Sequence, residues 1–177
     1  WKQSIAINPK YFDAYNNLIN ALLNLEKYDD ALEYINIAIK INPNNHELYH
    51  KRGNLFLKKN QLEKAVQNFD QALEIKNDYV PSLRNKVIVF KKNQKFDKAL
   101  KELDKLLLYD KDKFKAYMEK ALIYISLRNS FETLKNLKKA DSINPNSPFV
   151  LGDIIHEKTK MCDWSNLDFE LKSIKKK

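Results

Sequence analysis

The chain has 177 residues, of which 44% are hydrophobic and 31% are charged, a balance that argues against a disordered chain. It contains only 2 glycines and a single cysteine, which favours a helical protein without an internal disulfide. No stretch approaches the roughly 18 apolar residues needed to cross a bilayer, so we expect a cytoplasmic protein with no membrane partner.

Apolar residues recur every 34 residues along the chain. The alanines Ala31, Ala65 and Ala99 are spaced at this interval. Two further columns keep the same spacing, and they contain Tyr15, Tyr49, Leu83 and Tyr117 and, separately, Leu22, Phe56, Phe90 and Tyr124. Because a period of this length is typical of stacked helix pairs, we predict an all-α solenoid of helix–turn–helix repeats.

The period divides the chain into consecutive units. Trp1 aligns with a mid-helix column, so we expect residues 1–11 to be the second helix of a partial repeat and the chain to be a fragment of a longer array. Full repeats are predicted at residues 12–45, 46–79, 80–113 and 114–147. Residues 148–177 are predicted to hold a terminal helix, a Cys-Asp-Trp-Ser junction outside the period, and an amphipathic helix.

Each repeat combines two helix patterns and a turn. The first repeat has apolar residues at helical spacing, namely Tyr15, Leu18, Ile19 and Leu22. Asn-Pro pairs end the repeats because proline cannot continue a helix. Two Lys-Lys-Asn-Gln stretches place Asn60 and Asn93 in turns, and we predict that both asparagines adopt the left-handed backbone conformation.

These columns resemble the hallmark positions of the tetratricopeptide repeat family. The resemblance implies a right-handed superhelix in which the first helix of each pair lines a concave groove. Gly53 and Ala121 fit the small residue that the family has at the eighth position. The fourth repeat departs most from the pattern, with Ser130 at an otherwise apolar position and Thr133 in place of an alanine. We expect Phe131 to shift and fill the resulting gap.

The resemblance also implies which side chains face the groove. They are mostly amides and cations: Asn16, Asn17, Asn20, His50, Lys51, Asn54, Arg84, Asn85, Lys115 and Glu119. Since an amide can both donate and accept hydrogen bonds, such a row could hold an extended peptide or a partner protein by its backbone. We therefore predict protein–protein recognition at these residues. The alternative is that they are simply exposed side chains of a chain rich in asparagine and lysine.

Two other partners fit the residues less well. The carboxylate-clamp subtype of the family matches at Asn54, Asn85 and Lys115, but His50 and Glu119 stand where it has cations. An acidic residue in a carboxylate pocket would repel the ligand.

Nucleic acid is suggested as a partner by 32 basic against 23 acidic residues, a net charge of +9. The lysines, however, are spread along every predicted helix and are typical of solvated faces, which argues against an RNA-binding solenoid.

Residues 46–50 spell His-Glu-Leu-Tyr-His, the pattern of a zinc peptidase helix. The repeat explains this stretch without a metal, because Tyr49 occupies one of the apolar columns. The third histidine, His156, lies about three repeats away in the sequence. We therefore expect no catalytic residue, metal or cofactor in this chain.

The junction around Cys162 can be explained locally. Ser165 and Asp168 have the spacing of a capping box, Trp164 and Phe169 could form a hydrophobic staple, and an apolar stripe follows at Leu167, Leu171 and Ile174. A reactive thiol is the other local alternative, with only Lys158 and Lys160 near Cys162 in sequence to lower its pKa.

The same stretch resembles the junction in O-linked N-acetylglucosamine transferases of the SPINDLY type, where a repeat array runs through Cys-Asp-Trp-(Ser/Thr) into a catalytic region. Asn17 and Asn85 also match the asparagine ladder of that family, whereas Lys51 and Glu119 depart from it. The resemblance implies a substrate-recognition arm of a protein O-glycosyltransferase, with a downstream catalytic domain against which Cys162 and Trp164 pack. The alternative is a stand-alone adaptor without enzymatic activity.

Overall fold

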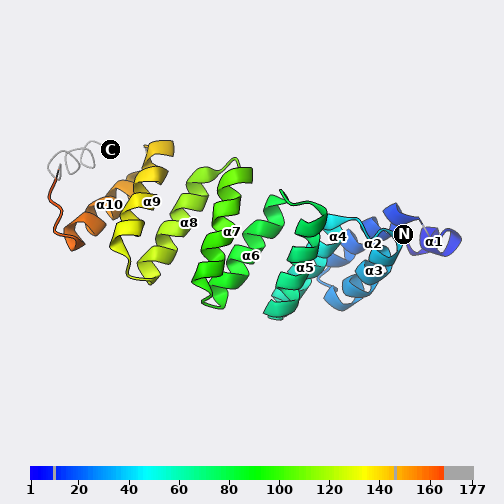
Figure 1. Cartoon of the computed structure of the whole chain (residues 1–177). Coiled ribbons are helices and arrows are strands. Elements are labelled where there is room, and N and C mark those ends of the chain that lie inside the picture. Colours follow the sequence, from blue (N-terminus) through cyan, green and yellow to red (C-terminus); the bar gives the residue numbers. More distant parts are fainter. Residues whose placement is uncertain (10, 146, 166–177) are drawn as a thin grey trace. The chain divides into compact units, whose positions relative to one another are not determined.

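The computed structural model describes residues 1–9, 11–145 and 147–165, and in this part of the chain it contains ten α-helices and no strand (Figure 1). The helices are α1 (Lys2–Ile7), α2 (Phe12–Asn24), α3 (Tyr28–Ile41), α4 (His46–Lys58), α5 (Leu62–Ile75), α6 (Val80–Lys92), α7 (Phe96–Tyr109), α8 (Lys113–Ser126), α9 (Ser130–Ile143) and α10 (Pro148–Lys160). The predicted all-α fold is confirmed. None of these helices combines the length and the apolar character required to cross a membrane.

The chain forms two compact units. The first, Trp1–Asn93, contains α1 to α6, and the second begins at Gln94 and contains α7 to α10 in its described part. In the first unit α2 packs on α3 and α4 packs on α5, while in the second α8 packs on α9. These neighbours are joined by short turns, so the architecture of each unit is a series of helix hairpins.

Side-chain caps and turn geometry explain where the helices begin and end. The side-chain oxygen of Asn45 accepts hydrogen bonds from the backbone N–H groups of Glu47 and Leu48 at the start of α4. Asn129 caps α9 in the same way, by accepting from the Glu132 N–H at 3.1 Å. Such caps satisfy backbone donors that have no partner inside the helix.

The turn that closes each first helix uses one residue with a left-handed backbone. These residues are 34 apart, with φ between 53° and 58°, and they are Glu26, Asn60, Gln94, Arg128 and Cys162. The prediction for Asn60 is correct, but Gln94 takes this role instead of Asn93. The second Lys-Lys-Asn-Gln stretch follows the first after 33 residues and not 34, so its asparagine falls one position early.

The register of these turns corrects the interpretation of the Cys162 stretch. Cys162 occupies the same turn position as Arg128 one period earlier. The Asp163 N–H donates to the Lys158 carbonyl, as the Asn129 N–H does to Tyr124. The chain therefore turns in step with the repeats at this point, and the period continues into the junction.

The core of each unit consists of the predicted apolar columns. Ala31, Ile35 and Ala38 are fully buried in the first unit, where they belong to a cluster that includes residues from α2 and α4. In the second unit, Leu137 and Ala140 of α9 pack with Val150 of α10. Small residues on these faces let the paired helices approach closely.

Gly53 is placed where a larger residue would not fit. A Cβ atom on it would lie 2.5 Å from Cε1 and 2.7 Å from Cδ1 of Phe69, whose side chain is fully buried. The glycine therefore leaves room for an aromatic ring that fills the space between α4 and α5. The fourth repeat solves the same packing problem with Ala121 and Leu137, residues at the corresponding positions.

Polar contacts between residues 16 apart connect α4, α6 and α8 to the second helix that precedes each of them. Lys86 Nζ lies 2.7 Å from the Asp70 carboxylate in the first unit, and Lys120 Nζ lies 2.6 Å from Asp104 in the second. Arg52 occupies the same place in α4 and donates to the Asn36 amide oxygen at 2.9 Å. These contacts help to fix the stacking of one hairpin on the next.

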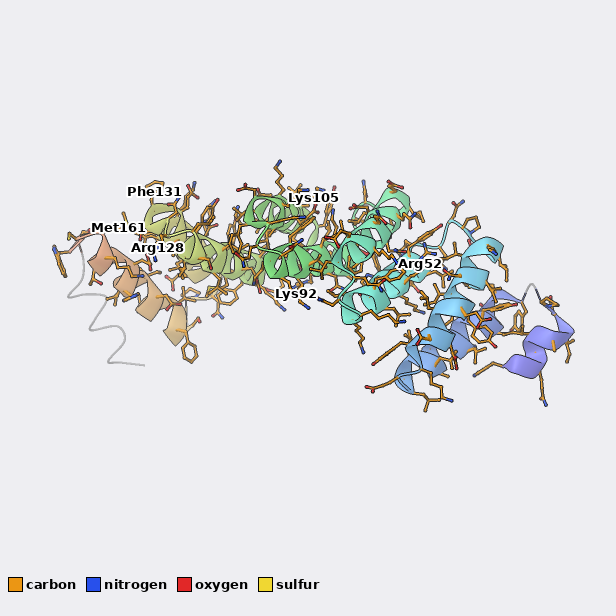
Figure 2. The ribbon with its side chains drawn as sticks, turned by 90° about the horizontal axis from the view of Figure 1, so that it is seen from below. Arg52, Lys92, Lys105, Arg128, Phe131 and Met161 are labelled. Carbon is orange, nitrogen blue, oxygen red and sulfur yellow. The ribbon has the colours of Figure 1, made fainter. Side chains whose placement is uncertain are left out.

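The fourth repeat is not completed in the predicted way. Phe131 is 66% exposed and projects from the ribbon, so it does not fill the gap beside Ser130 (Figure 2). The backbone keeps Ser130 as the first residue of α9, which turns the next side chain towards solvent. The space at Ser130 and Thr133 instead forms part of a pocket.

Candidate functional site

A lysine joins the first two predicted groove helices of the first unit. Lys51 on α4 donates through Nζ to the amide oxygens of Asn16 and Asn20 on α2, at 2.7 Å and 2.8 Å. An ammonium group can only donate, so the oxygens of both amides must face the lysine. Their NH₂ groups consequently point away from it.

A second set of contacts joins α4 to α6. Asn85 Nδ2 donates to Asn54 Oδ1 at 2.5 Å, and Asn54 Nδ2 lies 3.1 Å from Nε2 of His50. His50 Nδ1 lies 3.0 Å from the hydroxyl of the buried Ser82. The simplest consistent arrangement is a neutral histidine that accepts at Nε2 and donates from Nδ1 to Ser82, because the Asn54 oxygen already accepts from Asn85.

Aromatic side chains surround the His50 ring. Its centroid lies 5.3 Å from that of Tyr79 in an edge-on arrangement and 5.6 Å from that of Phe69. His46 contacts the same tyrosine, at 4.5 Å. Burial among these groups disfavours the charged ring and lowers the pKa of His50 to about 4. His50 is therefore neutral at physiological pH, in agreement with its hydrogen-bond pattern.

Six predicted groove residues thus form what we call the polar row: Asn16, Asn20, His50, Lys51, Asn54 and Asn85. Burial lowers the pKa of Lys51, which is half-buried in this row. Ser82 was missed by the sequence analysis, since nothing in the period marks a serine in this place as a partner of a histidine 32 residues earlier.

The other four predicted groove residues are not partners in the hydrogen bonds that define the polar row. Asn17 is exposed on α2, and Arg84 is half-buried on α6. Lys115 and Glu119 belong to α8 in the second unit, where Lys115 is exposed and its backbone N–H donates to the Asp112 cap. Their participation in a common binding surface stays a prediction.

The histidines of the His-Glu-Leu-Tyr-His stretch contact other side chains of the first unit. Both ring nitrogens of His50 are engaged, by Ser82 and Asn54. Within residues 1–9, 11–145 and 147–165, no group of three or more histidine, cysteine, aspartate or glutamate side chains is placed to hold a metal ion. The geometry of the described residues thus gives a zinc ion no ligand set.

The junction residues are exposed in the part of the chain that the structure describes. Cys162 is exposed and Trp164 is 61% exposed. Asp163 accepts hydrogen bonds from the backbone and the hydroxyl of Ser165, at 3.0 Å and 2.6 Å, which lowers the pKa of its carboxyl group. Packing of Cys162 and Trp164 on another domain stays a prediction. The proposed roles of Asp168, Phe169 and the stripe at 167–174 lie outside the described residues.

Comparisons with known proteins agree with the helix-hairpin architecture. Two family models described as tetratricopeptide repeats match residues 12–45 and 35–67. No curated protein sequence matches the chain. Together the two matches cover residues 12–67 of the first unit, from the start of α2 into α5.

Solved structures resemble the chain over most of its length. MamA from Desulfovibrio magneticus RS-1 has a TM-score of 0.72 at 17% identity, with 93% of each chain covered. YrrB, described as a TPR protein with an unusual peptide-binding site, has a TM-score of 0.74 at 16% identity. The alignment covers 98% of this chain and 89% of the YrrB chain. A tetratricopeptide repeat protein from Parabacteroides merdae ATCC 43184 has a TM-score of 0.71 at 16% identity, with coverages of 98% and 69%.

Identities this low indicate a shared fold and nothing further. The matches lend no support to the resemblance to SPINDLY-type transferases. Together, the 34-residue turn register, the helix hairpins and the matches to family models and solved structures support a tetratricopeptide repeat array.

Proposed function

We propose that the chain is a protein-interaction module whose polar row binds an extended segment of a partner protein. The observation that carries this proposal is the set of amide contacts that runs from α2 through α4 to α6. It presents polar groups from three successive first helices within one unit. An extended peptide repeats its own N–H and C=O groups along its length and can be matched by such a series.

The internal hydrogen bonds of the row orient its remaining groups towards a ligand. Because Lys51 holds the oxygens of Asn16 and Asn20, their NH₂ groups can donate to peptide carbonyls. Asn85 donates to Asn54 and therefore presents its own oxygen as an acceptor for a peptide N–H. Groups oriented before binding lose less conformational entropy when the ligand arrives. The row is thus suited to backbone recognition with little dependence on sequence.

YrrB provides a parallel on the same fold, since its description includes a peptide-binding site. The likeness itself shows only the shared fold. It supports the proposal because it demonstrates that a fold of this kind can present a surface to a peptide.

The proposal can be tested with an array of short peptides, followed by affinity measurements on those that bind. Asn16→Ala combined with Asn20→Ala removes two donors, each worth about 0.5–1.5 kcal/mol net, so we expect affinity to fall roughly 5- to 150-fold. Asn77→Ala, at an exposed turn residue, is the matched control and should leave affinity unchanged. Normal binding by the double variant would refute the assignment.

The salt dependence of the same measurements separates peptide binding from nucleic-acid binding. Neutral amides should hold a peptide with an affinity that changes little with ionic strength. RNA binding to this basic chain would instead weaken steeply as salt is added, because phosphate contacts release counterions.

A substrate-recognition arm of an O-glycosyltransferase is a narrower form of this function. It rests only on Cys162-Asp163-Trp164-Ser165 and the partial asparagine ladder. The structure gives Cys162 and Asp163 a second explanation as an ordinary repeat turn, which favours the adaptor alternative. Sequencing the coding DNA past Lys177 would decide: an open frame encoding alternating strands and helices supports the transferase, and an early stop removes it.

A further inference from the structure

Three polar residues of the second unit break the apolar columns at a single place. Ser130 takes a position that is otherwise large and apolar, Thr133 takes an alanine position, and Glu157 takes an aliphatic position of the first helices. The corresponding residues elsewhere are Tyr28, Leu62 and Phe96; Ala31, Ala65 and Ala99; and Ala21, Leu55, Val89 and Ile123. Departures from a local rule that converge on one point are expected at functional sites.

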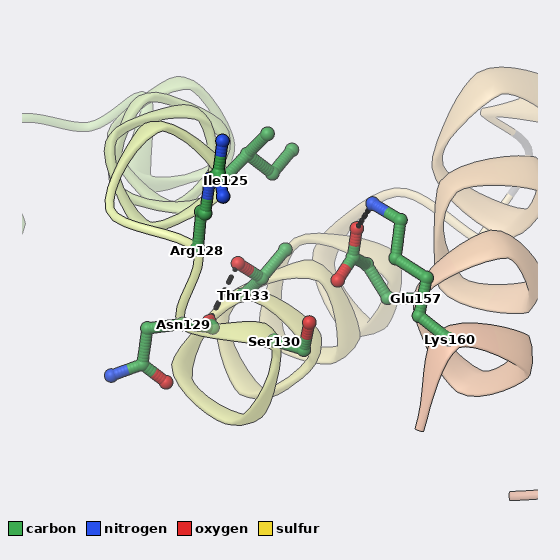
Figure 3. A pocket seen from close by; sticks show the side chains of 7 residues that line it. All are labelled: Ile125, Arg128, Asn129, Ser130, Thr133, Glu157 and Lys160. Carbon is green, nitrogen blue, oxygen red and sulfur yellow. Dashed lines mark hydrogen bonds and ion pairs between the residues drawn. The ribbon is translucent and has the colours of Figure 1, made fainter. Parts of the chain in front are cut away.

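These three residues line a pocket of about 400 Å³ formed by α8, α9 and α10 (Figure 3). Arg128, Asn129 and Lys160 complete its polar lining, and Ile125 adds an apolar flank. The volume is within the range of small-molecule sites, roughly 300–1,000 Å³. The pocket belongs entirely to the second unit and shares no residue with the polar row.

The acidic and hydroxyl groups of the pocket already have hydrogen-bond partners within the protein. The Glu157 carboxylate, 3% exposed as a residue, lies 2.7 Å from Lys160 Nζ and is also hydrogen-bonded by Ser130. Burial alone would raise the pKa of Glu157, but these two hydrogen bonds lower it overall, so the carboxylate is ionised. The Thr133 hydroxyl donates to the Asn129 carbonyl at 2.8 Å.

The groups left for a ligand are mainly donors. Arg128 lines the pocket and forms no side-chain hydrogen bond or ion pair within the described residues. The side chain of Asn129 caps α9 and points away from Glu157 and Lys160 in Figure 3. Lys160 has two further N–H donors besides the one directed at Glu157. The pocket also adjoins the N-terminus of α9, the positive end of a 14-residue helix.

We propose that this pocket is a second binding site, which takes a small oxyanion, a carboxylate or a phosphate, between Arg128 and Lys160. One carboxylate against two cations leaves a net charge of +1 in the lining. Glu157 serves as a positioning residue that holds the Lys160 ammonium at the pocket wall. Ile125 would contact the carbon skeleton of an organic acid. The site is independent of peptide binding at the polar row.

Calorimetry on the full chain at low ionic strength tests this proposal, with inorganic phosphate and succinate as separate probes. The probe that binds more tightly identifies the preferred oxyanion. Arg128→Gln should weaken binding by at least tenfold, the loss expected for one charge-assisted hydrogen bond. Glutamine is a suitable replacement because Gln94 has the same left-handed turn conformation one period earlier.

Two further variants test how the charges of the lining contribute to oxyanion binding. Glu157→Gln keeps an acceptor for Lys160, so oxyanion affinity should stay within twofold or increase. Lys101→Gln, at an exposed residue of α7, is the charge-matched control and should have no effect. The proposal is overturned if neither probe binds, or if Arg128→Gln binds as tightly as the unaltered chain. Loss of phosphate and succinate binding in Glu157→Gln would also overturn it, because removal of a negative charge from the lining should not weaken the binding of an oxyanion.

Discussion

Replacement of Gly53 by alanine is the clearest test of how α4 and α5 pack. The added Cβ would lie 2.5 Å from Phe69 Cε1, so the ring would have to retreat by about 0.9 Å to reach the 3.4 Å of ordinary contact. Phe69 is fully buried, so its ring can retreat only by moving its neighbours in the core. Overpacking of this kind costs about 1–3 kcal/mol, and the better helix propensity of alanine returns about 1 kcal/mol. We therefore expect Gly53→Ala to destabilise the chain by up to about 2 kcal/mol.

The double variant reverses the sign of this effect. In a Phe69→Leu background, Gly53→Ala meets no aromatic ring and should stabilise the chain by about 1 kcal/mol. The fourth repeat already uses the same pair of residues, Ala121 with Leu137. Urea unfolding followed by circular dichroism, with hydrogen exchange of α4 and α5 amides as a local readout, measures all four chains. Equal effects of Gly53→Ala in both backgrounds would refute the packing argument.

Three further predictions concern the polar residues and the turns. The pKa of His50 is about 4 in the folded chain and 6.5 in the unfolded chain, so the unfolded chain binds the proton more tightly. The free energy of unfolding should therefore rise between pH 4 and 6.5, by about 1–2 kcal/mol after allowance for partial exposure. In His50→Gln, the midpoint of urea unfolding should change less over this pH range. Gln94→Gly should raise the free energy of unfolding by up to about 1 kcal/mol, and Asn60→Gly by only a few tenths of that. Asparagine tolerates a positive φ better than glutamine does, so less strain is relieved at residue 60. Equal gains from the two variants would contradict this explanation. Asp70→Asn should lower the free energy of unfolding by about 1–2 kcal/mol, and by more than Asp104→Asn does. The reason is that Lys86, the partner of Asp70, is 7% exposed at its side chain, whereas Lys120, the partner of Asp104, is 15% exposed. Thermal unfolding of the two variants shows which of them is less stable.

The sequence contains most of the information on the fold. Apolar columns at a fixed period determine which faces pack, and the helices start at Phe12, His46 and Val80 as the columns indicate. Turn positions were harder to predict from residue type. Asparagine marked the turn at residue 60 but misplaced it at Asn93, because helix length and register determine which residue takes the left-handed conformation.

The candidate site was predicted less completely than the fold. Periodicity indicated which helix faces carry Asn16, Lys51 and Asn54, but not that Lys51 would bridge two asparagines of α2. Such contacts depend on side-chain rotamers and on the distance between hairpins. Ser130 and Thr133 depart from the repeat pattern in the sequence. The pocket could not be predicted from them, because it also depends on how α10 packs and places Glu157 beside them.

The most direct test of the central claim follows the side-chain amide signals of the asparagines by NMR while a bound peptide is titrated. If the polar row holds the peptide backbone, the NH₂ signals of Asn16 and Asn20 and the environment of Asn85 should shift together with saturation of binding, while those of Asn77 should stay unchanged. Saturable peptide binding without shifts at Asn16, Asn20 and Asn85 would contradict the account and place the binding surface elsewhere on the chain.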